Sequence, residues 1–282
     1  MASLISFFIL LSTFSLFLSN GRIANNLPPP AKVVELLKTQ GINQVKLYDT
    51  EASVLKALSG SNISVVVSLP NELLSKASSS QSFANSWVQQ NIMAYYPSTQ
   101  IIAIAVGNEV FVDPNNTTDF LVPAMKNIQA ALLSNKLDST IKISSPIALS
   151  CLQNSYPSSA GSFKPELTES VIKPMLDLIR QTGSHLMVNA YPFFAYESNS
   201  DVISLDYALF RENPGVVDSG NALKYFSLVE AQLDDVYAAM SALKYDDIKI
   251  VVSETGWPSK GNVRVRARKR RRKYFVTNTP ND

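Results

Sequence analysis

Short apolar segments rich in β-branched residues alternate along this chain with longer amphipathic segments, and this alternation constrains the fold more than any other feature. It is the pattern of βα units around a parallel sheet. The near-continuous apolar character of the short segments indicates strands that are buried on both faces. The predicted strands are 44–48, 63–69, 101–106, 141–145, 186–190 and 248–253. The predicted helices are 31–40, 51–58, 121–133, 168–182 and 228–243, with a longer helical region over 71–96.

Six such βα units can be identified, which is more than one half of a doubly wound sheet contains. None of the predicted strands is followed by a Gly-x-Gly-x-x-Gly or Gly-x-x-x-x-Gly-Lys-Ser/Thr loop, which disfavours a nucleotide-binding α/β fold. The chain has 282 residues, 46% of them hydrophobic, and this is enough for one large core. We therefore predict an α/β fold with the (β/α)8 TIM-barrel architecture.

The single cysteine and the single histidine narrow the possible chemistry. With Cys151 and His185 alone, the chain cannot build a disulfide framework or a Cys/His metal cluster, and the remaining chemistry belongs to carboxylates. We expect no metal and no organic cofactor. His185 precedes the predicted strand 186–190 and so belongs to the end of the barrel opposite the catalytic face, where its role is structural. Cys151 is expected to be a small, buried apolar residue.

Polar residues follow the predicted strands at the ends where barrel enzymes place their catalytic groups. Glu109 comes after strand 101–106, and Glu254 comes after strand 248–253. A single glutamate at the start of a loop is commonly an ordinary surface residue. Two of them at the same end of different strands can flank one bond, where one donates a proton and the other attacks an anomeric carbon or activates water. The pair therefore indicates glycoside hydrolysis.

Five segments, spread in order from residue 21 to about residue 261, resemble the family 17 glycoside hydrolases of plants. They are Gly21-Arg-Ile-Ala-Asn-Asn-Leu-Pro-Pro-Pro30, Val45-Lys-Leu-Tyr-Asp49, Ile104-Ala-Val-Gly-Asn-Glu-Val110, Leu186-Met-Val-Asn-Ala-Tyr-Pro-Phe-Phe-Ala-Tyr196 and the highly specific Val251-Val-Ser-Glu-Thr-Gly-Trp-Pro-Ser259. The resemblance implies a glucan endo-1,3-β-glucosidase that works with retention, with Glu109 as proton donor and Glu254 as nucleophile. Retention requires the two carboxyl groups to lie roughly 5 to 5.5 Å apart and the acid to have a raised pKa.

The same segments supply candidate substrate-binding residues. Asn108, beside the acid, is placed to hydrogen-bond a sugar hydroxyl next to the reacting carbon, although an asparagine after a strand also forms turns. Tyr48 and Tyr191 can hold the nucleophile or a sugar hydroxyl through their phenols. Trp257 and Phe194 can stack on the apolar faces of glucose rings. Packing in the barrel core is the alternative for these aromatic residues.

Two parts of the family pattern are absent from the sequence. An opening strand of the type Ile-Gly-Val-Asn-Tyr does not precede Gly21, and a basic run follows Ser259 where the family continues to an eighth strand. We therefore expect a barrel in which strands 1 and 8 are missing or replaced, with exposed ladder edges beside the gap. A catalytically impaired remnant that only binds glucan is the alternative to an active hydrolase, because retained motif residues do not guarantee the geometry of turnover.

The two ends of the chain differ in composition from the barrel region. An apolar run over 4–18 predicts a secretory signal at 1–20, followed by the barrel domain at 21–262 and a basic, disordered tail at 263–282. Eight Lys or Arg residues lie within 264–273, so the formal net charge of +2 leaves about −6 for the rest of the chain. A nucleic-acid or nuclear-localisation role for the tail is a further alternative, but a nuclear address conflicts with a secretory signal.

Taken with the resemblance, these features predict a monomeric, secreted protein of the extracellular space, cell wall or vacuole, with a β-1,3-glucan as its partner and a role in plant defence. We expect no nucleic-acid partner and no stable membrane span, because the N-terminal apolar run is too short. Candidate N-glycosylation sites, each in an Asn-x-Ser/Thr triplet, are Asn62, Asn115 and Asn116.

Overall fold

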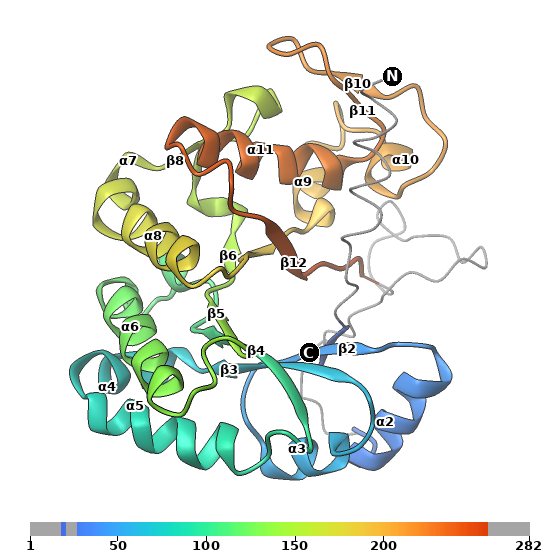
Figure 1. Ribbon diagram of the computed structural model, residues 1–282. Helices are drawn as coiled ribbons and strands as arrows, with labels where there is room; N and C mark the ends of the chain where they lie inside the picture. The colour runs from blue at the N-terminus through green and yellow to red at the C-terminus, as the bar shows by residue number, and fades with distance from the viewer. Residues whose placement is uncertain (1–17, 21–26, 259–282) are drawn as a thin grey trace.

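The computed structural model describes residues 18–20 and 27–258, and its framework is a ring of parallel strands surrounded by helices (Figure 1). Five strands pair in chain order, and they are β1 (Leu18–Asn20), β2 (Gln44–Leu47), β3 (Ser64–Leu69), β4 (Gln100–Val106) and β5 (Lys142–Ser144). The second sheet has the order β12, β9, β6 and consists of β6 (Ile147–Ala148), β9 (Leu186–Asn189) and β12 (Ile250–Glu254). All of these pairs are parallel.

Two junctions connect the sheets into one barrel. β5 and β6 are successive parts of one run, separated by Ser145 and Pro146, and a proline cannot donate a hydrogen bond to a sheet ladder. The carbonyl of Pro146 instead accepts a hydrogen bond of 2.9 Å from the backbone N–H of Glu109. On the other side of the barrel, β12 contacts β1. The carboxyl ends of strands from both sheets therefore lie on the same face, where barrel enzymes carry their active sites.

The helices lie outside the strands and bury one face against them (Figure 1). Two of them begin with strong start signals: α2 has Pro30 in its first turn, and α11 has a capping box formed by Ser227 and Glu230. The outer helices are α2 (Pro30–Thr39), α3 (Ala52–Leu58), α4 (Leu74–Ser79), α5 (Gln81–Val88), α6 (Thr118–Ser134), α7 (Pro165–Leu167), α8 (Lys173–Gln181) and α11 (Leu228–Ala242). Short turns of other helix types are η1 (Asn71–Leu73), η2 (Gln89–Met93), η3 (Val110–Val112), η4 (Leu149–Cys151), η5 (Ser158–Ala160) and η6 (Thr168–Ile172).

One hydrophobic core joins the strands to the helices, and completely buried members such as Val65, Ile104 and Met125 come from both. The predicted strands and helices all appear within a few residues of their expected bounds, which confirms the α/β prediction. The predicted helical region 71–96 is divided at Ser80, which has an extended backbone and caps α5 by accepting a hydrogen bond from the N–H of Phe83.

The position of the first barrel strand is occupied. The prediction allowed that strand to be missing or replaced, and the structure has a replacement: Leu18–Asn20 pairs in parallel with β2, with Leu18 opposite Val45. These three residues are the end of the predicted signal at 1–20, and the rest of that signal lies outside the described residues. The predictions for the eighth strand and for the basic tail at 263–282 also fall outside them. Within 18–20 and 27–258, no helix is long and apolar enough to cross a membrane.

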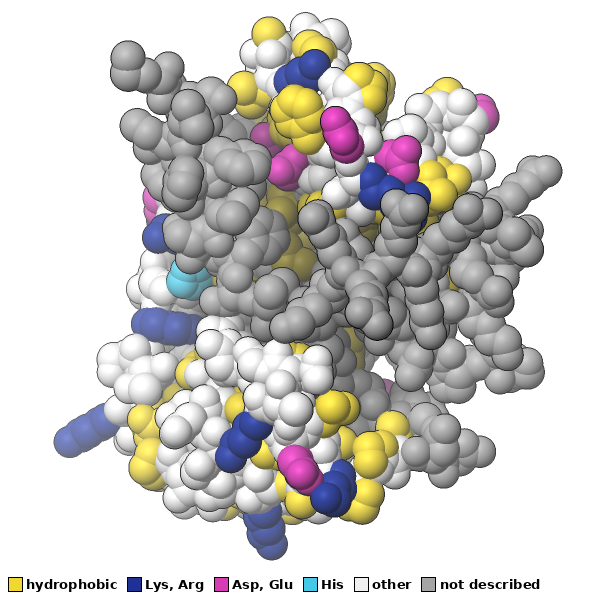
Figure 2. All heavy atoms as spheres, turned by 90° about the vertical axis from the view of Figure 1, so that its right-hand side faces the viewer, with side chains coloured by type: hydrophobic (Ala, Val, Ile, Leu, Met, Phe, Trp, Pro, Cys, Tyr) yellow, Lys and Arg dark blue, Asp and Glu magenta, His cyan; other side chains and the backbone are white. Residues whose placement is uncertain are grey.

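Two long connections form a wall above the barrel, and we call residues 149–164 and 191–227 the outer wall. It contains the antiparallel pairs β7 (Leu152–Asn154) with β8 (Ser162–Phe163) and β10 (Val216–Val217) with β11 (Lys224–Tyr225), and the short helices α9 (Pro192–Ser198) and α10 (Leu205–Ala208). The wall and the start of α11 share a small core of their own, formed by Tyr196, Tyr207, Ala208, Tyr225 and Leu228. Apolar side chains are exposed at the top of the molecule, over β10 and β11 (Figure 2). The sequence patterns did not predict these elements.

Candidate active site

All the predicted catalytic and substrate-binding residues line one cleft at the carboxyl ends of the strands. The cleft has a volume of about 1940 Å³ and runs from the strand ends to the outer wall and α11. The predicted residues in its lining are Tyr48, Asn108, Glu109, Tyr191, Phe194, Glu254 and Trp257. The barrel therefore brings together side chains that are more than 200 positions apart in the sequence.

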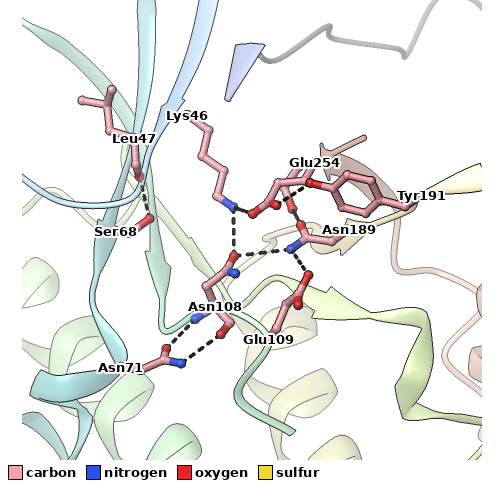
Figure 3. Close-up of polar contacts among 10 residues, drawn as sticks. Lys46, Leu47, Ser68, Asn71, Asn108, Glu109, Asn189, Tyr191 and Glu254 are labelled. Carbon is pink, nitrogen blue, oxygen red and sulfur yellow. Dashed lines mark hydrogen bonds and ion pairs between the residues drawn. The ribbon is translucent and has the colours of Figure 1, made fainter. Parts of the chain in front are cut away.

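Glu254 ends β12 and is held through both of its carboxylate oxygens (Figure 3). Its Oε1 accepts a hydrogen bond of 2.8 Å from Nζ of Lys46, and its Oε2 accepts one of 2.9 Å from the phenol of Tyr191. The residue is only 8% exposed. Because hydrogen bonds to a charged group are short and strong, these two donors fix the direction of the carboxylate.

Lys46 was not predicted as a site residue. It lies in the middle of β2, its side chain is completely buried, and its ammonium group also donates to Oδ1 of Asn108 at 3.0 Å and lies 4.7 Å from the ring centre of Tyr48. Burial lowers its pKa, while Glu254 and then Glu109 act in the opposite direction. The sequence does carry a signal: a lysine inside an otherwise apolar strand, two residues before Tyr48 and therefore on the same face.

Tyr191 is suited to donate to Glu254. Burial and then the charge of Glu254 raise the pKa of its phenol far above the ordinary value. The phenol is therefore protonated in the neutral range, and its O–H can only point to an acceptor such as the Glu254 carboxylate. The ring of Tyr48 lies beside Nζ of Lys46, so both tyrosines predicted from the sequence lie next to the buried ion pair.

A strained turn carries Asn108 and Glu109. Gly107 and Glu109 both have left-handed backbone, at φ +69° and +49°, and a Cβ atom on Gly107 would lie 2.5 Å from a methyl carbon of Val110. A non-glycine residue seldom adopts this conformation, so other contacts must stabilise it. The side chain of Asn71 supplies two of them, since it donates to the carbonyl of Asn108 at 3.0 Å and accepts from its N–H at 2.8 Å.

Asn189, at the end of β9, contacts Glu109 and Asn108 on one side and Ser253, next to Glu254, on the other. The sequence patterns did not predict it as a site residue. Its amide nitrogen donates to Oε1 of Glu109 at 2.7 Å and to Oδ1 of Asn108 at 3.4 Å, while its own oxygen accepts from the hydroxyl of Ser253 at 2.7 Å. Because the Lys46 ammonium can only donate, it requires the oxygen of the Asn108 amide to face inward. The NH2 group of Asn108 is therefore directed away from Lys46.

Aromatic residues form the side of the cleft beyond Tyr191. Phe194 is 58% exposed and lies 5.4 Å from Tyr191 between ring centres. Trp257 packs against Phe193 at 5.3 Å and against Tyr196 at 5.7 Å, so it contacts the small core of the outer wall and also lines the cleft. The position of Trp257 agrees with both alternatives, core packing and sugar stacking. The stacking of glucose rings on Phe194 and Trp257 stays a prediction.

The remaining residues singled out in the sequence lie outside the cleft lining. His185 lies just before β9, as predicted, and its side chain is exposed. Cys151 is a buried free cysteine, and burial raises the pKa of its thiol to about 12, which agrees with a small apolar role. The three glycosylation candidates Asn62, Asn115 and Asn116 are all exposed. Among the described residues, no group of His, Cys, Asp and Glu side chains could hold a metal ion.

Comparisons with known proteins agree with this arrangement. Residues 16–278 match the family described as "Glycosyl hydrolases family 17". One relative from Arabidopsis thaliana, Glucan endo-1,3-beta-glucosidase 10, is 44% identical over 88% of this chain and 59% of that protein. Another from the same organism, Glucan endo-1,3-beta-glucosidase 3, is 43% identical over 86% of this chain and 48% of that protein. The chain thus spans between about half and three fifths of the length of these curated relatives.

Solved structures give the same result. CJP38, a beta-1,3-glucanase and allergen of Cryptomeria japonica pollen, superimposes with a TM-score of 0.84 at 42% identity, over 88% of this chain and 77% of that chain. A structure from a study of two plant beta-glucan endohydrolases with distinct substrate specificities gives a TM-score of 0.82 at 37% identity, over 89% of this chain and 79% of that chain. These similarities confirm the predicted TIM-barrel fold and the family resemblance.

Proposed function

Because the chain belongs to glycosyl hydrolase family 17, we propose that it cleaves internal β-1,3-glucosidic bonds of glucans with retention of configuration. The observation that carries the proposal is the pair of glutamates at the strand ends of one cleft, with Glu254 held through both oxygens and Glu109 through Asn189. The named relatives are endo-1,3-beta-glucosidases, which supports the same bond specificity.

In the proposed reaction, the Glu109 carboxyl group donates its proton to the glycosidic oxygen while a carboxylate oxygen of Glu254 attacks the anomeric carbon. The bond to the leaving sugar breaks, and an ester bond forms between the remaining glucan and Glu254. Glu109, now ionised, then removes a proton from a water molecule that attacks the anomeric carbon and releases Glu254. Two displacements at the same carbon restore the original configuration.

The neighbours of Glu254 support its role as nucleophile. Nζ of Lys46 donates to one oxygen of the Glu254 carboxylate at 2.8 Å, and the phenol of Tyr191 fixes the second oxygen. We infer that Lys46 and Tyr191 are positioning residues, which act on the sugar through Glu254. Asn108 has its amide oxygen occupied by Lys46, which leaves its NH2 group for the sugar hydroxyl beside the anomeric carbon. Hydrogen bonds to that hydroxyl strengthen in the transition state.

The expectations for cellular location and partner remain part of the proposal. A secreted protein of the cell wall or vacuole, acting on a plant or fungal β-1,3-glucan, would pass through a compartment where exposed Asn62, Asn115 and Asn116 can be glycosylated. The lining of the cleft contains several carboxylates and, among the described residues, no Lys, Arg or His. This charge distribution favours a neutral polysaccharide over an anionic partner such as a nucleic acid.

The test is the release of reducing ends from a linear β-1,3-glucan by the purified chain, next to a Glu254→Gln variant and a β-1,4-glucan. We expect release from the β-1,3-glucan only, and a loss of at least about a thousandfold in the variant. Equal activity in the variant would contradict the assignment of Glu254. Tight glucan binding without release would identify the alternative, a glucan-binding remnant of the family.

A further inference from the structure

Asn71, which lies outside the cleft lining, holds the turn that carries Asn108 and Glu109 (Figure 3). It is half-buried and is the first residue of η1, directly after Pro70. Its Nδ2 donates to the carbonyl oxygen of Asn108 at 3.0 Å, and its Oδ1 accepts from the N–H of Asn108 at 2.8 Å. A backbone N–H can only donate and a carbonyl can only accept, so these contacts require both ends of one amide group.

Three successive N–H groups of the turn, those of residues 107 to 109, each donate to a different acceptor. The acceptors are the carbonyl of Leu69, the side chain of Asn71 and the carbonyl of Pro146, at 2.9, 2.8 and 2.9 Å. Two of them are backbone groups, so Asn71 provides the contact that depends on the identity of a side chain. A substitution at position 71 therefore removes this support and leaves the other two in place.

The peptide unit between Asn108 and Glu109 is held at both ends. Its carbonyl oxygen accepts from Asn71, and its N–H donates to the carbonyl of Pro146. Rotation of this unit would change φ of Glu109, which at +49° lies in the left-handed region that a glutamate seldom adopts. Without the contact from Asn71, the backbone can relax toward an ordinary negative φ. Asn71 thus opposes the relaxation that would displace the Glu109 side chain.

Asn71 is itself held in place by its neighbours. Its carbonyl oxygen accepts from the N–H of Leu74, whose side chain is completely buried at the start of α4. The turn packs closely on the Asn71 amide, because a Cβ atom added to Gly107 would lie 3.1 Å from Oδ1 of Asn71. The amide group is therefore attached to the hydrophobic core on one side and to the turn on the other.

We propose that Asn71 is a positioning residue for proton transfer by Glu109, and that it acts through the backbone of Asn108. The inference rests on the proposed function, in which Glu109 is the acid. Loss of the two hydrogen bonds should move the Glu109 carboxyl group away from the glycosidic oxygen, and a displacement of about 1 Å can cost on the order of a hundredfold in rate. Because Asn71 lies outside the cleft lining, kcat should fall while KM changes little.

The experiment compares kcat/KM of wild type and Asn71→Ala on two substrates. One is a β-1,3-linked gluco-oligosaccharide, whose leaving sugar must receive a proton. The other is the same sugar chain joined to a strongly acidic phenol, which can leave as the phenolate without a proton. We expect a loss of about tenfold to a hundredfold on the first substrate and a loss at least about fivefold smaller on the second. Equal losses on both substrates would overturn the proposal, because partial unfolding lowers both values alike.

Two further variants separate positioning from folding. Asn71→Leu restores most of the side-chain volume but neither hydrogen bond, so it should show the same substrate-dependent loss as Asn71→Ala. The matched control is Asn127→Ala, because Asn127 is also half-buried and donates to two backbone carbonyls, those of Ala77 and Ser78, at 2.8 and 3.1 Å. We expect this control to lower the melting temperature and to leave kcat/KM unchanged on both substrates. Full activity of Asn71→Leu, or the same substrate-dependent loss in the control, would contradict the proposal.

A Glu109→Gln variant in the same assays distinguishes the two levels of inference. If the wild-type chain acts on neither substrate, the proposed function is wrong, and the role of Asn71 is wrong with it. If Glu109→Gln loses activity equally on both substrates, Glu109 is not the acid. If Glu109→Gln shows the substrate-dependent loss and Asn71→Ala does not, the proposed function stands and only the role of Asn71 is wrong.

Discussion

At the strand ends of the cleft the acceptor oxygens have donors inside the protein, whereas at the outer end two acceptors have none. Both oxygens of Glu254 accept hydrogen bonds, and one oxygen of Glu109 is held by Asn189. Gln232 and Asp235 are as deeply buried as Glu254 but keep one unpartnered oxygen each. The comparison indicates that internal donors hold the proposed reacting groups before substrate arrives, whereas the two oxygens on α11 are buried without a donor.

Among changes at the strand ends of the cleft, we expect the largest loss of activity from a change of Glu109. A Glu109→Gln variant should lose about 10² to 10⁴ in kcat/KM on β-1,3-glucan, because the leaving sugar must be protonated. In an aryl β-glucoside made from a strongly acidic phenol, the phenolate can leave without receiving a proton. The loss of kcat/KM on that substrate should therefore be much smaller. The ratio of the two losses is measured by initial rates. Equal losses on both substrates would remove Glu109 from the role of acid.

A change of Lys46 tests whether stability and activity depend on the buried ion pair between Lys46 and Glu254. A Lys46→Met variant leaves the buried Glu254 carboxylate without its cation, and breaking a buried pair from one side costs about 3–5 kcal/mol. We expect lower stability in urea and a fall in kcat of about a hundredfold or more, because the Glu254 carboxylate loses the donor that fixes one of its oxygens. The exposed lysine change Lys38→Met is the matched control and should alter stability by less than about 0.5 kcal/mol. An unchanged kcat in Lys46→Met would make Lys46 structural only.

A change of Tyr191 should have a smaller effect on kcat, and Tyr245 offers a matched control. The phenol of Tyr245 also donates to a carboxylate, Asp177, at 2.7 Å, but it lies outside the cleft lining. One hydrogen bond to a charged group is worth about 1.5–3 kcal/mol, so Tyr191→Phe should lower kcat roughly tenfold to a hundredfold with little change in KM. Tyr245→Phe should lower stability and leave kcat unchanged. Similar kcat values in both variants would show that Tyr191 does not position the nucleophile.

At the outer end, Asp235 predicts a pH dependence of stability. Burial, opposed by Ser158 and assisted by the charges of Asp234 and Asp218, raises its pKa from 3.8 to about 7 in the folded protein. The folded state then binds more protons than the unfolded state between these values, so stability falls as pH rises through this window and levels off above about 7. We expect the wild-type chain to lose about 1–2 kcal/mol relative to Asp235→Asn between pH 5 and 7, measured by urea unfolding. A constant difference between the two proteins would contradict the raised pKa.

The barrel and the position of the two glutamates in its cleft could be predicted from the sequence because they depend on local patterns. Continuous apolar strands, amphipathic helices and polar residues just after the strands are visible in short windows. Glu109 and Glu254 follow directly from that reading, and the family segments name the same residues.

The missed residues depend on contacts between distant parts of the chain. Lys46 meets a carboxylate 208 positions away, and Asn189 meets Glu109 80 positions away. The outer wall has strands of two or three residues, too short to show a period, and its structure is set by tertiary contacts. Gln232 and Asp235 lie on a helix whose pattern assigns polar residues to solvent, so their burial against a cleft was hidden.

The most direct test of the central claim is to trap the proposed glycosyl-enzyme. The protein is incubated with a 2-deoxy-2-fluoro β-1,3-linked glucoside that carries an activated leaving group, and its peptides are mapped by mass spectrometry. The fluorine slows both displacements, while the leaving group lets the first proceed, so the covalent ester accumulates. We predict a single sugar adduct on the carboxyl group of Glu254. An adduct on Glu109 or another residue, or steady release of sugar from β-1,3-glucan without any adduct, would contradict the assignment.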